Sequence, residues 1–493
     1  KELDCEVFKN INCKNLPSLR RNIVYQFLYE LLIVFIPLFT IPYVSRVLGA
    51  ENIGLFSYTY AVANYFVLFA NLGIKNYGSR TIAMVRNNKE ELNRNFSEIL
   101  SIHIIFSIIV IFVYLVLLFF FVEDNLVIFL IQSIYIFAAV FDINWFFFGI
   151  EKFKLTVGRN TLVKILSVFL VLVFVKTQTD LWIYALILAL SVFVGQSVVW
   201  FALKQYVSWR RPSWANMKQH IRPLFVLFLP ILALSLYKYM DKIMLGSISS
   251  NVQVGFYENA EKIINVPMSL IMAFGVVLMP RIANMVTSKD KGEVFKLIDM
   301  SMEAVMLLAI AISFGLAGIS FVLAPIFFGY EFEECGILIM GLAVTVPFMA
   351  FANVIRTQYL IPYKEDKIFV VSLFLGAAVN LIVNIILIPY MAARGAVIGT
   401  IFAEIIVCIY QSYFVRKKIF IKKYLLNTIP PILIGIVMFV FVFQIGNVMN
   451  INIVTLILQL VVGMFIYAVG VFLLMLKSRT RLMVLLRKFV VRY

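Results

Sequence analysis

The sequence predicts an all-α polytopic membrane protein with about 14 transmembrane helices, arranged as two pseudo-symmetric six-helix bundles plus two C-terminal helices. Three observations predict this class: the composition, the length of the apolar segments and a similarity between the two halves of the chain. Of the 493 residues, 62% are hydrophobic and only 14% are charged. A chain with so few charged side chains needs lipid around it, which argues against a soluble enzyme.

Long apolar segments recur along the whole chain, and each is long enough to cross a hydrocarbon core of roughly 30 Å as a helix. We predict spans at residues 22–47, 53–74, 97–121, 126–148, 156–176, 181–203, 223–246, 254–280, 300–324, 335–360, 367–389, 395–415, 424–446 and 452–476. The predicted organisation is an N-terminal tail (1–21), an N-terminal bundle (22–205), a cytoplasmic linker (206–222), a C-terminal bundle (223–418), helices 13 and 14 (424–476) and a basic tail (477–493).

The net charge of +17 comes from basic residues that lie in short segments between the apolar ones. Basic residues are retained on the cytoplasmic side of a membrane. Placing both termini in the cytoplasm assigns roughly 37 of the 43 lysines and arginines to that side. The charge therefore predicts membrane topology, with both tails cytoplasmic, and no nucleic-acid partner.

The two halves of the chain resemble each other. Leu48-Gly49 and Gly54 in the first half correspond to Leu245-Gly246 and Gly255 in the second. The separation from Gly54 to Arg80 equals the separation from Gly255 to Arg281. A repeat of six helices enters the membrane from the same side in both copies, so we predict a parallel repeat around a central cavity.

Neither the cysteines nor any catalytic motif in the sequence indicates a cofactor. The four cysteines (Cys5, Cys13, Cys335 and Cys408) have no metal-binding spacing, and no Walker loop or hydrolase motif is present. We therefore expect a transporter that is not an enzyme, holds no metal and draws its energy from an ion gradient or the membrane potential.

A polar stripe in the seventh predicted helix gives the first candidate site. Lys238, Asp241 and Lys242 recur at helical spacing, and Asp241 can neutralise only one of the two lysines. The remaining positive charge predicts an anion-binding site; the alternative is a solvated helix end. Arg46 and Lys262 complete the substrate-binding candidates, although helix capping also explains Arg46 and a local pair also explains Lys262.

Other polar residues inside the predicted spans are candidates for ion coupling: Glu404, Glu30, Glu258, Asn380 and Asn384. Glu404 lies roughly 15 Å from either end of its helix, so it either binds a proton or cation or pairs with another helix. Glu258 and Lys262, four residues apart, can form a structural pair. Asn380 and Asn384 can coordinate a cation or form hydrogen bonds between helices.

Several segments resemble the bacterial polysaccharide flippases, which handle O-antigen, capsule and exopolysaccharide repeat units. The residues that carry the resemblance are Asn22, Pro37, Pro42, SRVLGAENIGLFSY at 45–58, NLGIKNYGSRTIA at 71–83, KYMDKIMLG at 238–246 and RGAVIGTIFAE at 394–404. These flippases belong to the multidrug/oligosaccharidyl-lipid/polysaccharide exporter superfamily.

The resemblance implies translocation of an undecaprenyl-pyrophosphate-linked oligosaccharide across the bacterial inner membrane by alternating access. The implied partners are this lipid and other membrane lipids, with a glycan polymerase and a chain-length regulator as further candidates. Two alternatives are a cation-coupled multidrug exporter and a peptidoglycan-precursor (lipid II) flippase. A membrane glycosyltransferase or polymerase is disfavoured because the external loops are short.

The stripe gives an expectation for variants. Lys238→Ala or Lys242→Ala should weaken glycan export with folding intact, because each removes an unpaired charge. Asp241→Ala should also lower protein abundance, because it leaves two unneutralised lysines.

Overall fold

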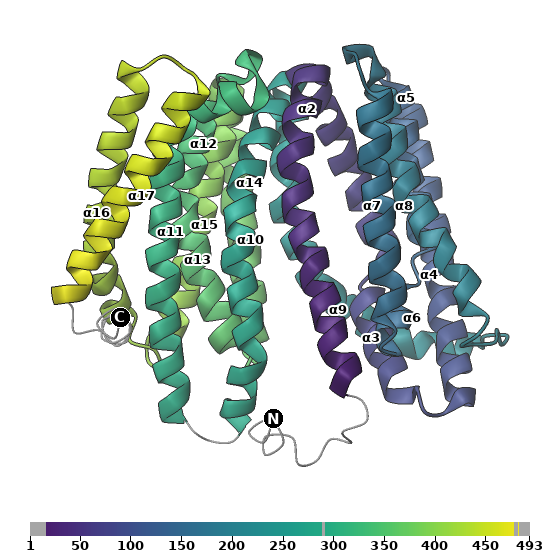
Figure 1. The fold of residues 1–493 in the computed structure, drawn as a ribbon. Coiled ribbons are helices and arrows are strands. Elements are labelled where there is room, and N and C mark those ends of the chain that lie inside the picture. Colours follow the sequence, from purple (N-terminus) through teal and green to yellow (C-terminus); the bar gives the residue numbers. More distant parts are fainter. Residues whose placement is uncertain (1–15, 288–290, 478–481, 483–493) are drawn as a thin grey trace. The chain divides into compact units, whose positions relative to one another are not determined.

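The computed structural model describes residues 16–287, 291–477 and 482 (Figure 1). Within these ranges the regular structure is entirely helical, and each predicted span coincides with one helix or with consecutive helical elements, with ends that differ by a few residues. Twelve helical segments of the described chain are long and apolar enough to cross a membrane. The predicted all-α membrane fold is confirmed, whereas Cys5, Cys13 and most residues of the two predicted tails lie outside the described residues.

The described chain forms two compact units. The first contains the residues up to Thr40, Phe66–Lys176 and Trp182–Phe228, and the second contains Ile41–Tyr65, Thr177–Leu181 and the residues from Leu229 onward. The helices are α2 (Leu16–Asn71), α3 (Ile74–Val85), α4 (Lys89–Phe121), α5 (Leu126–Val140), α6 (Asn144–Gly149), α7 (Phe153–Phe174), α8 (Leu181–Leu203), α9 (Trp214–Ile248), α10 (Asn251–Thr287), α11 (Lys291–Phe328), α12 (Cys335–Ala343), α13 (Thr345–Ile355), α14 (Asp366–Met391), α15 (Ala393–Val415), α16 (Ile421–Val448) and α17 (Ile453–Lys477). Helices α2 and α9 contribute to both units.

The core of the first unit gathers at the end where α3 and α6 lie (Figure 1). The short helix α6 contributes three buried aromatic residues, Trp145, Phe146 and Phe147. The ring of Trp145 stacks on Phe96 of α4 with centroids 5.5 Å apart. This aromatic packing fixes the connections between the helices at that end of the unit.

In the second unit, α16 and α17 pack on α11 (Figure 1). Their contact contains Ile319 and Val322 of α11, Met438 and Val442 of α16, and Leu456 of α17, all buried. The two predicted C-terminal helices therefore have an apolar packing surface of their own.

Four predicted spans differ in detail from the observed helices. The first two spans meet directly in α2 at Gly49, which has a φ of 76°. The fourth span breaks between α5 and α6, where the Asp142 carboxylate accepts a hydrogen bond from the Asn144 backbone N–H at 3.0 Å. The tenth span divides into α12, α13 and a π-helical turn at Arg356–Leu360. In each case apolar composition gives the span, and local backbone bonding gives the break.

The junction in α2 is held by a residue from a distant part of the chain. The Glu331 carboxylate accepts a hydrogen bond from the Ala50 backbone N–H at 2.8 Å, just after Gly49. A carboxylate at this place satisfies one of the unpaired N–H groups at the start of a helix. The second half of α2 therefore begins on a cap supplied by the segment between α11 and α12.

Counterpart glycines of the predicted repeat meet where α2 crosses α10. A Cβ added to Gly54 would lie 1.6 Å from the Asn251 carbonyl oxygen, and one added to Gly255 would lie 2.1 Å from the Ala50 carbonyl oxygen. No side chain fits at either place, so the two backbones are in direct contact. We call this contact the glycine seam.

Candidate functional site

Helices α9 and α10 share a cluster of four charged side chains. The Lys242 ammonium lies 2.5 Å from Glu258 and 2.8 Å from Glu261. Lys262 lies 3.1 Å from the other oxygen of Glu258, so the predicted pair between these two residues is confirmed. Lys242 therefore does not carry the excess positive charge predicted for the stripe, because two carboxylates of α10 neutralise it.

Asp241 faces other helices. It is buried, and its carboxylate accepts hydrogen bonds from Tyr257 at 2.6 Å, Asn384 at 2.5 Å and Thr400 at 3.0 Å. The prediction that Asp241 neutralises a lysine of its own helix is therefore wrong. Successive helical residues point about 100° apart, so Asp241 and Lys242 contact different neighbours.

The asparagines of α14 extend this arrangement. Asn384 also donates a hydrogen bond to the side-chain oxygen of Asn380 at 3.2 Å. The predicted hydrogen bonding between helices is confirmed by the bond from Asn384 to Asp241. The side-chain oxygen of Asn384 is buried and has no hydrogen-bond partner in the described part of the chain. An unpaired buried oxygen of this kind suits a polar ligand.

Lys238 differs from its two neighbours in the predicted stripe. Its side chain is exposed, and it forms no ion pair with any residue that the structure describes. Its ammonium lies 5.3 Å from the ring centroid of Tyr239, whose ring packs edge-on against Tyr65 at 6.0 Å. The unpaired charge predicted for the stripe is thus carried by Lys238 alone, next to two aromatic rings.

The two tyrosines were not among the predicted site residues. Tyr239 directly follows Lys238 in the sequence, but Tyr65 comes from α2. An aromatic residue beside a lysine could have been noted as a candidate for cation–π contact. The contact of Tyr239 with Tyr65 could be recognised only from the fold, because the two residues lie far apart in the sequence.

Arg46 and Glu30 are the candidate site residues of the first predicted helix. Arg46 is exposed and donates a hydrogen bond to the backbone carbonyl of Ile326 at 2.5 Å, near the end of α11. This bond supports the capping alternative for Arg46. Glu30 belongs to α2, but its side chain lies outside the described residues.

Glu404 of α15 lines a cavity of about 150 Å³ together with Arg356. The two charges interact electrostatically, so Glu404 has an oppositely charged neighbour on another helix. Arg356 also donates a hydrogen bond to Asn353 at 2.6 Å and lies 5.5 Å from the ring centroid of Phe369. This arrangement supports the predicted pairing of Glu404 with another helix.

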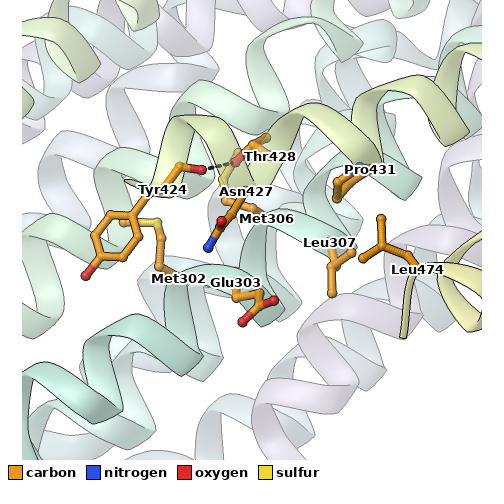
Figure 2. Close-up of a pocket in the computed structure, with 9 residues that line it drawn as sticks. All are labelled: Met302, Glu303, Met306, Leu307, Tyr424, Asn427, Thr428, Pro431 and Leu474. Carbon is orange, nitrogen blue, oxygen red and sulfur yellow. Dashed lines mark hydrogen bonds between the residues drawn. The ribbon is translucent and has the colours of Figure 1, made fainter. Parts of the chain in front are cut away.

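Two further hollows occur between α11 and the C-terminal helices. The first, of about 20 Å³, lies between α11 and α16 (Figure 2) and has room for one water molecule at most. Figure 2 shows the Thr428 hydroxyl donating a hydrogen bond to the Tyr424 carbonyl within α16. The second, a groove of about 860 Å³, is lined mainly by apolar residues of α11, α16 and α17. This groove is large enough to accept a long apolar chain.

The fold is shared with two kinds of membrane transporter. It matches a lipid II flippase, MurJ, in an inward closed conformation with a TM-score of 0.70, at 16% identity over 91% of this chain and 97% of that one. It also matches an inward-facing multidrug resistance MATE family transporter of the MOP superfamily with a TM-score of 0.59, at 13% identity over 79% and 97% of the two chains. The chain thus shares its fold with these two membrane transporters.

Sequence comparison identifies the family. The family described as "Polysaccharide biosynthesis protein" matches residues 19–286, more than half of the chain. The chain therefore belongs to this family. Two relatives are both named "Putative O-antigen transporter": one from Shigella dysenteriae is 24% identical over 80% of this chain and 99% of its own, and one from Escherichia coli K12 is 26% identical over 81% and 97%.

Proposed function

We propose that the protein translocates a lipid-linked oligosaccharide, with an undecaprenyl-pyrophosphate anchor, across the bacterial inner membrane. The observation that carries the proposal is Lys238, an ammonium without an ion pair among the described residues and beside Tyr239 and Tyr65. A charge at membrane depth is costly unless it has a partner, and a pyrophosphate supplies that partner as an anion. Family membership and the names of the two relatives favour a glycan lipid over other anions.

The apolar part of such a substrate needs a separate path. The groove along α11, α16 and α17, of about 860 Å³, has the size and lining to accept a polyprenyl chain. In this proposal the sugar and phosphates pass near Lys238 while the chain stays in apolar surroundings. A glycan polymerase and a chain-length regulator are the partners that would use the exported unit.

We further propose that a monovalent cation or a proton couples to transport at Asp241, Asn380 and Asn384. A carboxylate and amide oxygens are ligands that hard cations prefer, and the buried oxygen of Asn384 is available. No cluster of three or more His, Cys, Asp or Glu side chains that could hold a metal ion occurs in the described residues. Asp241 is the one carboxylate of this proposed site, and one carboxylate balances the charge of one monovalent cation or proton. Glu258 is a weaker coupling candidate because Lys242 and Lys262 already neutralise it. Glu404, next to Arg356, and Glu30 stay as further candidates.

Translocation can be tested with the full chain in proteoliposomes that contain a lipid-linked oligosaccharide. The unmodified protein is expected to move the lipid between leaflets, and collapsing the ion gradients and the membrane potential should stop net movement. Lys238→Ala should lower the rate by about tenfold or more, because a charge-assisted contact to the phosphates is lost.

Matched variants separate the site from general effects of charge. Lys367→Ala removes an exposed lysine at the start of α14 and should leave the rate unchanged. Lys238→Arg should retain most of the activity because it keeps the charge. Equal rates for the unmodified protein and Lys238→Ala would contradict the proposed role of Lys238. Faster movement of lipid II than of the oligosaccharide lipid would instead favour a peptidoglycan-precursor flippase.

We also propose that both termini are cytoplasmic, because most basic residues then lie on that side. In a chain without its native cysteines, Asn125→Cys and Asn450→Cys should react with an impermeant thiol reagent in intact spheroplasts. Lys418→Cys should react only after the membrane is opened. All three positions are exposed, so burial does not limit the reaction. The reverse labelling would overturn the orientation.

A further inference from the structure

The first unit contains a basic pocket of about 490 Å³. Three connections between helices form it: α3 to α4, α6 to α7, and α8 to α9. Each of these connections follows an even-numbered predicted span, so all three emerge on the same side of the membrane. The pocket is lined by Arg86, Asn87, Lys89, Leu92, Ile150, Lys152, Gln205 and Tyr206.

Positive charge dominates the lining. Three of its eight residues are cations and none is acidic. Arg86 pairs with Glu151 at 2.6 Å, and the Lys152 ammonium lies 6.0 Å from the ring centroid of Tyr206. Neither Lys89 nor Lys152 forms an ion pair within the described ranges. Like charges held around one hollow repel one another, and a bound anion relieves that repulsion.

The wall beneath the cations is apolar. Leu92 is buried in the core of the first unit, and Ile150 and Tyr206 pack against the same core. The pocket therefore combines a cationic rim with a hydrophobic wall. An amphiphile with a phosphate head complements both surfaces, whereas a free phosphate complements only the rim.

Two tryptophans indicate the depth of the pocket. Trp209 and Trp214 follow Tyr206 at the connection that leads into α9, and they are 53% and 60% exposed. Exposed tryptophans in membrane proteins gather at the level of the lipid headgroups. The pocket therefore opens where lipid phosphates lie.

Hydrogen bonds hold the connection from α8 to α9 against α4. The Ser208 backbone N–H donates to Asn93 at 3.0 Å, and the Arg210 backbone N–H donates to Ser97 at 2.9 Å. The Arg210 side chain also pairs with Glu90 at 3.3 Å. The pocket is thus set on fixed backbone, which lowers the entropy lost when a ligand binds.

We propose that this pocket binds the phosphate of an anionic membrane lipid from the surrounding leaflet. Arg86, Lys89 and Lys152 contact the phosphate oxygens, and Leu92, Ile150 and Tyr206 contact the apolar region beneath the headgroup. Basic pockets at the ends of transmembrane helices recognise anionic headgroups in this way. The site lies within the first unit, and it does not depend on which molecule the protein translocates.

The test is lipid binding to the purified full chain in detergent, measured by native mass spectrometry. The probes are cardiolipin, phosphatidylglycerol, phosphatidylcholine and inorganic pyrophosphate. The double variant Lys89→Gln with Lys152→Gln should bind one anionic lipid fewer, with about thirtyfold weaker affinity at that site, because each lysine near a lipid surface contributes about a fivefold effect. The double variant Lys204→Gln with Lys218→Gln removes the same charge from exposed lysines outside the pocket and should bind as the unmodified protein does.

Binding of cardiolipin or phosphatidylglycerol that the pocket variant loses and the control variant keeps would support the proposal. Equal anionic lipid binding by both double variants would overturn it. Binding of phosphatidylcholine as strong as that of the anionic lipids would also overturn it, because the pocket would then not recognise the negative charge of the lipid headgroup. If the protein bound inorganic pyrophosphate but retained no lipid, the ligand would be a free phosphate compound, and the proposal of a lipid ligand would be overturned.

Discussion

Gly54→Ala is expected to lower the rate of translocation by about tenfold or more and to lower the unfolding temperature. The added Cβ would lie 1.6 Å from the Asn251 carbonyl oxygen, so α2 and α10 would have to move apart at the glycine seam. Backbone atoms cannot move aside as a flexible side chain can, and overpacking of this kind costs about 3 kcal/mol. The rate is measured in proteoliposomes and the unfolding temperature on the purified protein.

Gly292→Ala is the matched control. Gly292 is also a helical glycine of the second unit, but an added Cβ there would meet no atom of the described residues within 4 Å. Alanine should be neutral there or stabilise the helix by up to about 1 kcal/mol. If Gly54→Ala matched this control in rate and stability, the seam would not be a constraint on the working protein.

Lys242→Met is expected to lower membrane abundance and to reduce the free energy of unfolding by about 3 kcal/mol. The substitution removes the common partner of Glu258 and Glu261 and leaves negative charge in a largely buried place. This outcome reverses the expectation from sequence, in which Lys242 was unpaired and its removal eased insertion. Abundance is measured in membranes, and unfolding is measured on the purified protein.

Two comparisons make this prediction specific. Lys238→Met makes the same chemical change at an exposed lysine that has no ion pair among the described residues, so abundance should stay normal. Combining Lys242→Met with Glu258→Gln and Glu261→Gln should restore much of the abundance, because the carboxylates are neutralised. Normal abundance of Lys242→Met alone would show that the cluster contributes little to stability.

Local rules predicted the parts of the structure that depend on neighbours in sequence. Apolar length gave the spans, because a membrane helix must satisfy its own backbone. The four-residue spacing gave the pair between Glu258 and Lys262, which face the same side of α10. Lys238 and Lys242 also stand out in the sequence, because lysine is rare at membrane depth.

The partners of these residues could not be predicted in the same way. Asp241 bonds to Asn384 and Thr400, which lie 143 and 159 residues away. Sequence spacing within one helix assigns Asp241 to a lysine, whereas packing of α10, α14 and α15 gives it three neutral donors. For the same reason, the contact between Tyr65 and Tyr239 could not be predicted from spacing within one helix. Spacing shows which residues share a helix face, but only the fold shows what faces them.

The hydrogen bond from Ala50 to Glu331 sets a delay in biosynthesis. Its two residues are separated by 281 positions, so the cap of the second half of α2 is translated long after the helix it serves. At about 5 to 20 residues per second, the ribosome needs roughly 15 to 55 s to cover those 281 positions. During that time the second half of the nascent α2 lacks the cap that Glu331 supplies in the folded protein.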